Sequence, residues 1–204
     1  MTDRLTDRLN SDARGAALPE GALERFRRRA AAEGLADVAY DRIETPFGDY
    51  LAAKTPRGLV RLAFLWRYDE GDAVEELARR VSPRVLRAPE RLDDVRRQLE
   101  EYFAGGRRRF ELPLDRSLMA GFSRKVLNRT ARIPYGRVST YLEVAAGAGS
   151  PRAYRAAGNA LANNPIPIVV PCHRVLATGG GLGGYGGGLE MKRRLLDLEG
   201  AEVA

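Results

Sequence analysis

Cysteine and histidine are almost missing from this sequence: its 204 residues include one of each, and these two residues, Cys172 and His173, are neighbours. One cysteine cannot form an internal disulfide, and one cysteine with one histidine cannot complete a structural zinc site. No stretch approaches the roughly 18 apolar residues of a membrane span, and the N-terminus lacks an apolar signal segment. With no cofactor motif either, we expect a cytoplasmic protein that has no metal or cofactor and no membrane partner.

Lysine is scarce as well, since it occurs only at positions 54, 125 and 192 and arginine supplies the other 31 of the 34 basic residues. A GC-rich coding bias would explain much of this arginine, but its distribution is uneven. Residues 104–174 carry twelve basic and three acidic side chains, whereas residues 1–103 carry nineteen and twenty. A net charge of +9 concentrated around Cys172 indicates a polyanionic partner, with nucleic acid favoured over a membrane surface.

Residues 1–35 are charged and poor in large apolar side chains, which predicts a disordered leader with a short helix around residues 23–32. Residues 36–112 are expected to form a small α+β domain without a catalytic cluster of its own. Its predicted elements are a β-hairpin over residues 47–53 and 59–65 with a turn at 55–58, helices over 72–81 and 89–103, and a return to the sheet at 109–112.

Residues 113–204 are expected to form a second, mostly helical domain. A capping box of Thr140 and Glu143 opens one helix, and Ser150 followed by Pro151 is a signal for the start of the next. Two helices joined by a glycine turn are typical of a helix-turn-helix. The predicted helices cover residues 117–130, 140–146, 150–163 and 189–198.

The second helix of this motif is expected to present Arg152, Arg155 and Asn159 on one face, a pattern suited to DNA. The alternative is a solvated arginine face on a packed helix, and the +9 segment favours DNA. Eight of residues 179–188 are glycine. This segment is either a flexible linker or a loop whose backbone approaches a flat ligand closely, with Tyr185 as its one large side chain.

Cys172 is the natural candidate for a nucleophile. A thiol reacts as thiolate, so a base or a cation must assist it, and His173 and Arg174 are the obvious helpers. The alternative is that Cys172 is a small apolar filler behind an apolar strand. Adjacent side chains diverge on both strands and helices, so a direct bond between the two side chains needs a sharp turn. A water between thiol and imidazole, with an acid holding the far ring nitrogen, would meet the same need.

Several short motifs follow one another in the second half of the chain. They are Ile133-Pro134-Tyr135-Gly136-Arg137-Val138, Asn164-Pro165, Pro171-Cys172-His173-Arg174-Val175, Gly184-Tyr185 and Leu195-Leu196-Asp197-Leu198-Glu199-Gly200. Together they resemble the O6-alkylguanine-DNA alkyltransferases (methylated-DNA–protein-cysteine methyltransferases). The resemblance covers roughly residues 45–200 and is dense from residue 117 onward.

The resemblance implies that Cys172 takes the alkyl group from the O6 atom of a guanine flipped out of duplex DNA. It implies that His173 activates the thiol through a water and that Glu199 orients the histidine. Asn164 matches the asparagine that joins the recognition helix to the active-site segment. Some family members bind zinc in the N-terminal domain, but this chain lacks ligands for it.

The resemblance also implies residues for holding the base and the DNA. Tyr185 would line the guanine pocket, and the backbone carbonyl of Val175 would read the amine of the base. Gly186 replaces a residue that can offer a hydroxyl in relatives, so the pocket would be roomier. Arg155 would fill the gap left by the flipped base, and Tyr141 would press on the target phosphate, with the helix-turn-helix in the minor groove.

We therefore expect an α+β protein with a ribonuclease-H-like N-terminal domain and a winged helix-turn-helix DNA-binding domain. It would act as a monomer on double-stranded DNA, repairing O6-alkylguanine and also O4-alkylthymine in a single turnover. Two rival hypotheses remain. One is a non-catalytic damage sensor, against which Cys172 argues, and the other is a cysteine hydrolase, which would regenerate its thiol.

Overall fold

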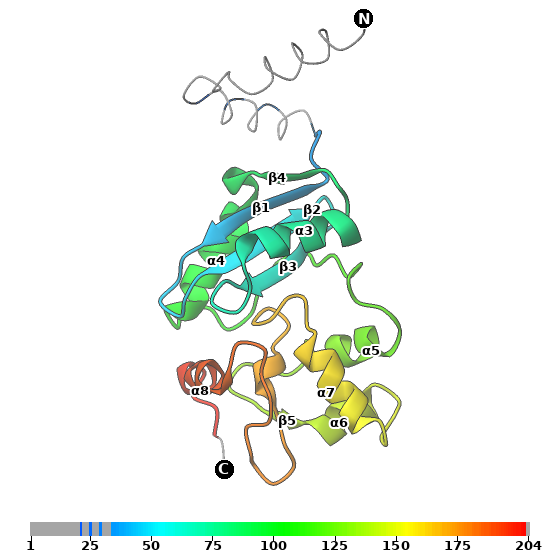
Figure 1. The fold of residues 1–204 in the computed structure, drawn as a ribbon. Coiled ribbons are helices and arrows are strands. Elements are labelled where there is room, and N and C mark those ends of the chain that lie inside the picture. Colours follow the sequence, from blue (N-terminus) through cyan, green and yellow to red (C-terminus); the bar gives the residue numbers. More distant parts are fainter. Residues whose placement is uncertain (1–20, 22–24, 26–28, 30–33, 203–204) are drawn as a thin grey trace, which may run out of the picture. The chain divides into compact units, whose positions relative to one another are not determined.

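The computed structural model describes residues 21, 25, 29 and 34–202 of the chain (Figure 1). The predicted leader over residues 1–35, with its short helix over 23–32, lies outside the described residues apart from a few single positions. Residues Ala36–Ala204 form one unit. None of the helices described in the structure is long and apolar enough to cross a membrane.

The N-terminal half of this unit is built on a four-stranded sheet (Figure 1). Its strands are β1 (Val38–Ile43), β2 (Tyr50–Thr55), β3 (Gly58–Phe64) and β4 (Val85–Arg87), in the order β3-β2-β1-β4. The antiparallel β2–β3 pair confirms the predicted hairpin, while β1 is antiparallel to β2 and parallel to β4.

Strand β1 was not predicted, because its sequence lacks the apolar run of a buried strand. Its Asp41 is buried, and Arg87 and Arg96 lie 3.0 and 2.6 Å from its two carboxylate oxygens. These ion pairs allow a charged residue to occupy a central strand. The residues that allow this strand to form therefore include distant arginines, which the sequence of the strand itself does not reveal.

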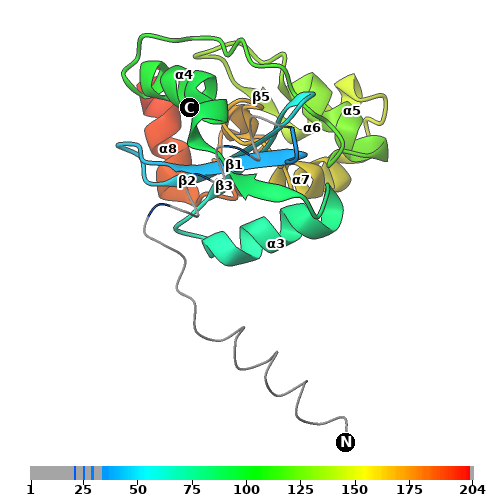
Figure 2. The same ribbon diagram turned by 90° about the horizontal axis from the view of Figure 1, so that it is seen from above.

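Two helices cover the two faces of the sheet, α3 (Glu70–Arg80) on one and α4 (Asp93–Phe103) on the other (Figure 2). A 3-10 turn, η1 (Pro89–Leu92), leads into α4, so both predicted helices are confirmed. Side chains alternate along a strand. Leu51 therefore belongs to the apolar cluster of Leu77 on α3, whereas Tyr50 belongs to that of Leu99 on α4.

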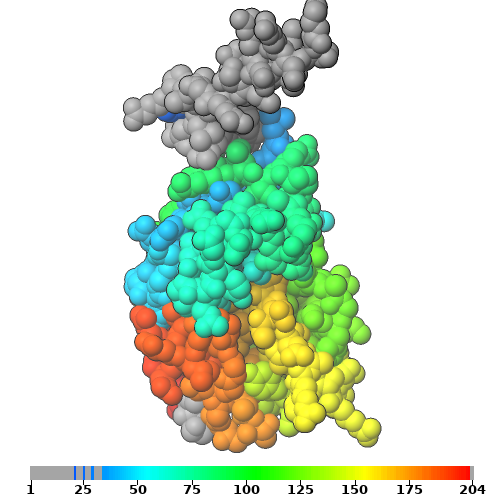
Figure 3. Space-filling model, in the orientation of Figure 1, coloured from blue at the N-terminus to red at the C-terminus, as the bar shows by residue number. Residues whose placement is uncertain are grey.

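The apolar cluster on the α4 side continues into the C-terminal half, where it includes Ile166, Cys172 and Leu195. In Figure 3 the residues coloured cyan to green lie directly against those coloured yellow to red. A backbone bond also joins the two halves, because the N–H of Leu62 on β3 donates to the carbonyl of Pro165 at 2.8 Å. The segment that precedes Cys172 is thus attached to the outer edge of the sheet.

The predicted return of residues 109–112 to the sheet is wrong. A single bridge pairs Leu114 with Leu59, flanked by bonds from Leu59 N–H to the Pro113 carbonyl at 2.8 Å and from Asp115 N–H to the Leu59 carbonyl at 2.9 Å. Upstream, the Glu111 N–H donates instead to the Gln98 side chain at 2.7 Å. That side-chain acceptor diverts the backbone from strand pairing.

The C-terminal half is mostly helical, as expected. Its elements are α5 (Gly121–Thr130), β5 (Ser139–Thr140), α6 (Tyr141–Gly147), α7 (Tyr154–Ala162), η2 (Cys172–Arg174), β6 (Val175–Leu176) and α8 (Leu189–Leu198). The short strands β5 and β6 pair in parallel. The capping box is confirmed, since the Glu143 N–H donates to the Thr140 hydroxyl at 3.2 Å and the Thr140 N–H to the Glu143 carboxylate at 2.8 Å.

Two helices begin later than predicted. Ser150 does not cap α7, because its carbonyl accepts the Ala153 N–H at 2.9 Å in a turn, and α7 begins at Tyr154. Arg152 consequently lies before the helix and does not share a helical face with Arg155 and Asn159, as had been expected. Helix α5 begins at Gly121 rather than at residue 117.

The hairpin turn provides a test of the fold. Gly58 has φ +130°, and a Cβ added there would lie 2.1 Å from the Pro113 carbonyl oxygen. We expect Gly58→Ala to lower the free energy of unfolding by about 2–4 kcal/mol in urea titrations, from backbone strain plus displacement of residue 113.

Gly105 is the matched control, because it has φ +75° with nothing within 4 Å of an added Cβ. Gly105→Ala should lower the free energy of unfolding by only about 1 kcal/mol. Equal losses in the two variants would contradict the close approach of residue 113 to the turn.

Candidate active site

Cys172 does not follow an apolar strand, which the alternative interpretation of it as a filler had assumed. Ile168 has φ +71°, residues Pro167 and Val170 form an isolated bridge, and Cys172 opens the 3-10 turn η2. The chain therefore makes a sharp turn at the thiol, of the kind that a direct bond between thiol and imidazole would need, but within the described residues no hydrogen bond joins the two side chains. It places the buried sulfur of Cys172 and the buried imidazole of His173 on one short turn.

The buried side chain of Asn164 holds this turn in place. Its oxygen accepts the Ile166 N–H at 3.1 Å, and its Nδ2 donates to the Val170 carbonyl at 2.7 Å and to the Cys172 sulfur at 3.2 Å. All the hydrogen-bonding groups of the amide are thus used within nine residues. Asn164 fixes the loop and provides the thiol with a donor that favours its anion.

Burial raises the pKa of the Cys172 thiol to about 11, although the Asn164 hydrogen bond and the charge of Lys192 oppose the rise. At neutral pH the resting side chain is therefore the thiol and not the thiolate. A reaction at this sulfur needs a group that accepts its proton.

The neighbouring His173 is fully buried and bonds through Nε2 to Oε1 of Glu199 at 2.9 Å. Arg174 grips the same carboxylate with two bonds of 2.8 Å, from Nε to Oε2 and from Nη2 to Oε1. These partners hold the pKa of Glu199 well below its usual range, while burial is the main cause that lowers the pKa of His173. Arg174 therefore balances the Glu199 charge, and the imidazole stays neutral.

A neutral imidazole that donates from Nε2 carries its free lone pair on Nδ1. Among the described residues, Nδ1 of His173 is buried and has no hydrogen-bond partner. An unpaired buried acceptor is unfavourable unless it serves a purpose. Next to a thiol that must lose a proton, this nitrogen is suited to act as the base.

The sequence analysis did not identify two further hydrogen-bond donors to Glu199. The hydroxyl of Tyr102, on α4, donates to Oε1 at 2.6 Å, and the N–H of Gly136 donates to Oε2 at 3.2 Å. The apolar stripe of α4 indicated that Tyr102 is buried but gave no signal of its partner. The N-terminal half, in which no catalytic cluster was expected, thus contributes directly to the network behind Cys172.

Lys192 was also missed. It is fully buried on α8, and its ammonium donates to the Val175 carbonyl at 2.5 Å, to the Leu182 carbonyl and to the Gly184 carbonyl at 3.5 Å. Burial lowers the pKa of Lys192 to about 8. The lysine ties the glycine-rich loop to β6, and it already occupies one lone pair of the carbonyl that was expected to read the base.

The glycine-rich loop packs against Tyr141. The Tyr141 hydroxyl donates to the Gly184 carbonyl at 3.3 Å, and a Cβ on Gly183 would lie 2.7 Å from that hydroxyl. Tyr185 packs its ring against Phe64 and His173, with centroids 5.7 and 6.3 Å apart. The backbone of this loop therefore lies close to a tyrosine of the protein itself, and its approach to a flat ligand stays a prediction.

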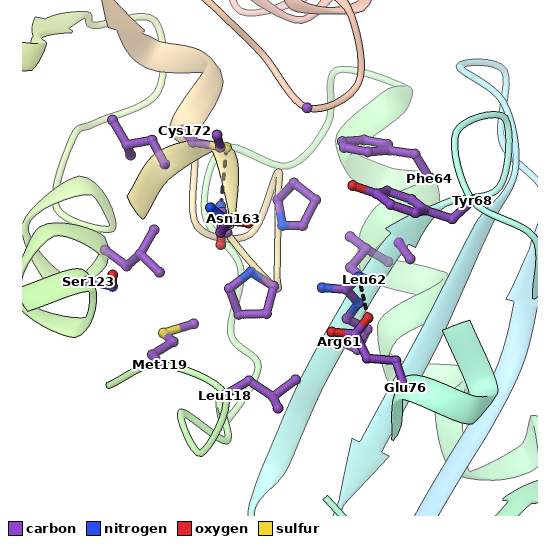
Figure 4. A pocket seen from close by; sticks show the side chains of 18 of the residues that line it. Arg61, Leu62, Phe64, Tyr68, Glu76, Leu118, Met119, Ser123, Asn163 and Cys172 are labelled. Atoms are coloured by element: carbon purple, nitrogen blue, oxygen red, sulfur yellow. Dashed lines mark hydrogen bonds and ion pairs between the residues drawn. The ribbon is translucent and has the colours of Figure 1, made fainter. Parts of the chain in front are cut away.

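A cavity of about 540 Å³ borders the thiol (Figure 4). Four of the predicted site residues line it: Cys172, Asn164, Tyr185 and Gly186. The remaining predicted residues do not line this cavity. Of these, Val175, His173, Arg174 and Glu199 are buried. Arg152 and Arg155 are exposed near the start of α7, where the Arg155 guanidinium lies 5.7 Å from the centre of the Tyr154 ring.

A buried thiol beside a neutral histidine, next to two helices joined by a turn with exposed arginines, is the arrangement expected of a cysteine-dependent protein of the DNA-binding class. Comparison with known proteins agrees. The model of 6-O-methylguanine DNA methyltransferase, ribonuclease-like domain, matches residues 38–116, and that of 6-O-methylguanine DNA methyltransferase, DNA binding domain, matches residues 121–201.

Similar proteins cover most of the chain. The methylated-DNA–protein-cysteine methyltransferase of Methanosarcina barkeri is 40% identical over 160 residues, which make up 78% of this chain and 96% of the relative. The constitutive enzyme of that name from Bacillus subtilis is 39% identical over 164 residues, or 78% of this chain and 94% of the relative.

The crystal structure of Mycobacterium tuberculosis O6-methylguanine methyltransferase superposes with a TM-score of 0.68 and 36% identity, covering 80% of this chain and 93% of that one. A crystal structure of the M. tuberculosis protein in complex with DNA gives the same TM-score and identity, covering 79% and 92%. The chain belongs to the O6-methylguanine-DNA methyltransferase family, and the predicted fold class is confirmed.

The raised thiol pKa predicts a steep pH dependence. Because Cys172 has a pKa of about 11, its thiolate fraction should rise about tenfold per pH unit between pH 7.5 and 9.5. We expect the rate of alkylation by iodoacetamide, followed by intact mass, to rise in proportion, with Cys172→Ser as the unreactive control. A rate that levels off below pH 8 would contradict the protonated resting state.

The Tyr102 hydroxyl provides a second test. Tyr102→Phe keeps the ring but removes the donor to a buried carboxylate, which should lower the free energy of unfolding by about 1.5–3 kcal/mol. It should also slow the alkylation of Cys172. Tyr135→Phe is the matched control, because that hydroxyl donates at 2.9 Å to the Leu198 carbonyl instead of the carboxylate. Equal effects of the two changes on Cys172 reactivity would show that Tyr102 does not act through Glu199.

Proposed function

We propose that this chain is a DNA-repair alkyltransferase that moves an alkyl group from the O6 atom of guanine in duplex DNA to Cys172. One observation carries the proposal: the lone thiol of the chain borders a cavity and adjoins a neutral histidine whose second nitrogen has no hydrogen-bond partner within residues 34–202. The family supplies the reaction class, since relatives that align over nearly their whole length are named methylated-DNA–protein-cysteine methyltransferases.

In the proposed reaction the sulfur forms a bond to the alkyl carbon while the bond between this carbon and guanine O6 breaks. The thiol proton passes through a water to Nδ1 of His173. The guanine takes up a proton, which neutralises the negative charge left on it when this bond breaks. The products are a thioether on Cys172 and unmodified guanine.

Each buried partner has a proposed role in this step. Glu199 holds the imidazole in the tautomer that leaves Nδ1 free, Arg174 keeps Glu199 ionised, and Asn164 donates to the sulfur as negative charge develops. The relative orientation of thiol and base is fixed before DNA arrives, since every one of these groups is buried.

DNA binding is proposed for the helix-turn-helix, with Arg155 filling the gap in the stack and Tyr141 pressing on the target phosphate. Support comes from the match to the DNA binding domain and from the relative crystallised with DNA. Arg152 would contact the DNA backbone from the turn before α7. We propose a monomer that also accepts O4-alkylthymine, with Tyr185, Gly186 and the Val175 carbonyl around the base.

The rival hypotheses differ from this proposal in turnover. A damage sensor transfers nothing, and a hydrolase regenerates its thiol, whereas a thioether is inert and the chain has no second cysteine to remove it.

We therefore expect transfer from a duplex containing O6-methylguanine to stop at one methyl group per protein, whatever the excess of DNA. The intact mass of the protein should show a gain of one methyl group. Peptide mapping should locate this group on the peptide that contains Cys172. Cys172→Ser should transfer nothing while binding the duplex with nearly unchanged affinity, because the interface depends on charge. Repeated turnover by the purified protein would favour the hydrolase, and absence of transfer would favour the sensor.

A further inference from the structure

The cavity next to Cys172 also borders a charged group that the transfer reaction does not use. Arg61 on β3 and Glu76 on α3 both line it, and their side chains pair at 3.0 Å. Figure 4 places this pair on the sheet side of the cavity and Cys172 on the opposite side. The cavity is therefore reactive at one side and charged at the other.

The charged side has an excess of positive charge. Glu76 also pairs with Arg80 at 2.6 Å, so two guanidinium groups share one carboxylate. The Arg61 side chain is only 14% exposed and lies over the Tyr68 ring at 5.9 Å. Its Nε is buried and has no hydrogen-bond partner among the described residues. An unsatisfied donor on a partly desolvated cation attracts a hydrogen-bond acceptor or an anion.

The geometry of displacement directs a long substituent away from the reaction axis. Sulfur, the attacked carbon and the leaving oxygen must lie nearly in line for the reaction. The remainder of an alkyl chain is attached to the attacked carbon and has to leave this line sideways. A cavity that borders the sulfur is where such a chain can extend.

The cavity has room for such a chain. One water takes up about 30 Å³ of liquid, and the cavity volume is about 540 Å³. Methyl transfer alone leaves most of this space unused. The lining includes Pro167 and Gly186, with Cys172 on the reactive side and Tyr68, Glu76 and Arg61 on the sheet side (Figure 4).

We propose that this cavity is a subsite for long O6 substituents and that Arg61 selects those whose far end is a carboxylate or another hydrogen-bond acceptor. The inference rests on the proposed alkyl transfer and assigns to the N-terminal sheet a part in substrate choice. Methyl groups are too short to reach Arg61, so the selection applies only to longer adducts.

The test compares matched adducts in one duplex sequence: O6-butylguanine against O6-(3-carboxypropyl)guanine, and O6-hexylguanine against O6-(5-carboxypentyl)guanine. Single-turnover rates give a ratio, carboxylated over plain, for each chain length. Arg61→Leu should lower this ratio about tenfold at one chain length or both, because a charge-assisted hydrogen bond is lost. Arg61→Lys should restore part of it.

A second variant should change the ratio of carboxylated over plain transfer rates in the opposite direction. Glu76→Gln keeps Arg61 but removes the carboxylate that competes for it, so the ratio should rise. Arg84→Leu is the matched control for charge, since Arg84 pairs with Asp37, is 62% exposed and does not line the cavity. Its ratio should equal that of the unmodified protein.

Unchanged ratios in both Arg61→Leu and Glu76→Gln, with methyl transfer still measurable, would overturn the role of Arg61. A ratio that falls equally in Arg84→Leu would overturn it too, since the effect would then be one of general charge. Absence of transfer from every adduct, including O6-methylguanine, by the unmodified protein would instead refute the proposed function. The two failures are thus distinguishable.

Discussion

The buried carboxylate of Glu199 is the constraint on which the rest of the site depends. Its charge is paired with Arg174, and it accepts further hydrogen bonds from His173, Tyr102 and Gly136. A buried charge that loses its ion-pair partner is destabilised by about 3–5 kcal/mol, and the loss of a neutral donor costs about 1.5–3 kcal/mol, so the donors must be in place when the chain folds. The donors come from α4, from the loop before β5 and from η2, while Glu199 itself caps α8. One carboxylate thereby aligns elements from both halves of the molecule.

Burial has opposite consequences for the reacting groups. It keeps His173 neutral, which leaves Nδ1 able to accept a proton, but it also raises the pKa of Cys172 to about 11 and so disfavours the thiolate. The balance suits the single transfer proposed for this protein, because a protonated thiol reacts slowly with chance alkylating agents and becomes a nucleophile only when a base accepts its proton. The bond from Asn164 and the charge of Lys192 favour the thiolate.

The N-terminal half does more than support the helical half. Its helix α4 provides Tyr102 to the network behind the thiol, and β3 provides both a backbone bond to Pro165 and the Arg61 side of the cavity. Positively charged side chains therefore occur in two environments in this protein, one exposed to solvent and one mostly buried. The exposed arginines near α7 are proposed to contact a DNA backbone, where charge acts at long range, whereas Arg61 is mostly desolvated and can act only on a group that enters the cavity.

The sequence by itself determined the elements with local signals: the β2–β3 hairpin, the capping box of α6 and the bounds of α8. It also contains only one thiol, so Cys172 is the one cysteine that can be proposed as the nucleophile. It also indicated the family through short motifs. Tertiary structure decided what local signals do not contain. Strand β1 forms because distant arginines pair with Asp41, α7 starts late because the Ser150 carbonyl closes a turn, and Tyr102 meets Glu199 across 97 positions of the chain. Local propensity acts over a few residues, whereas partners of buried charge are chosen by packing of the whole chain.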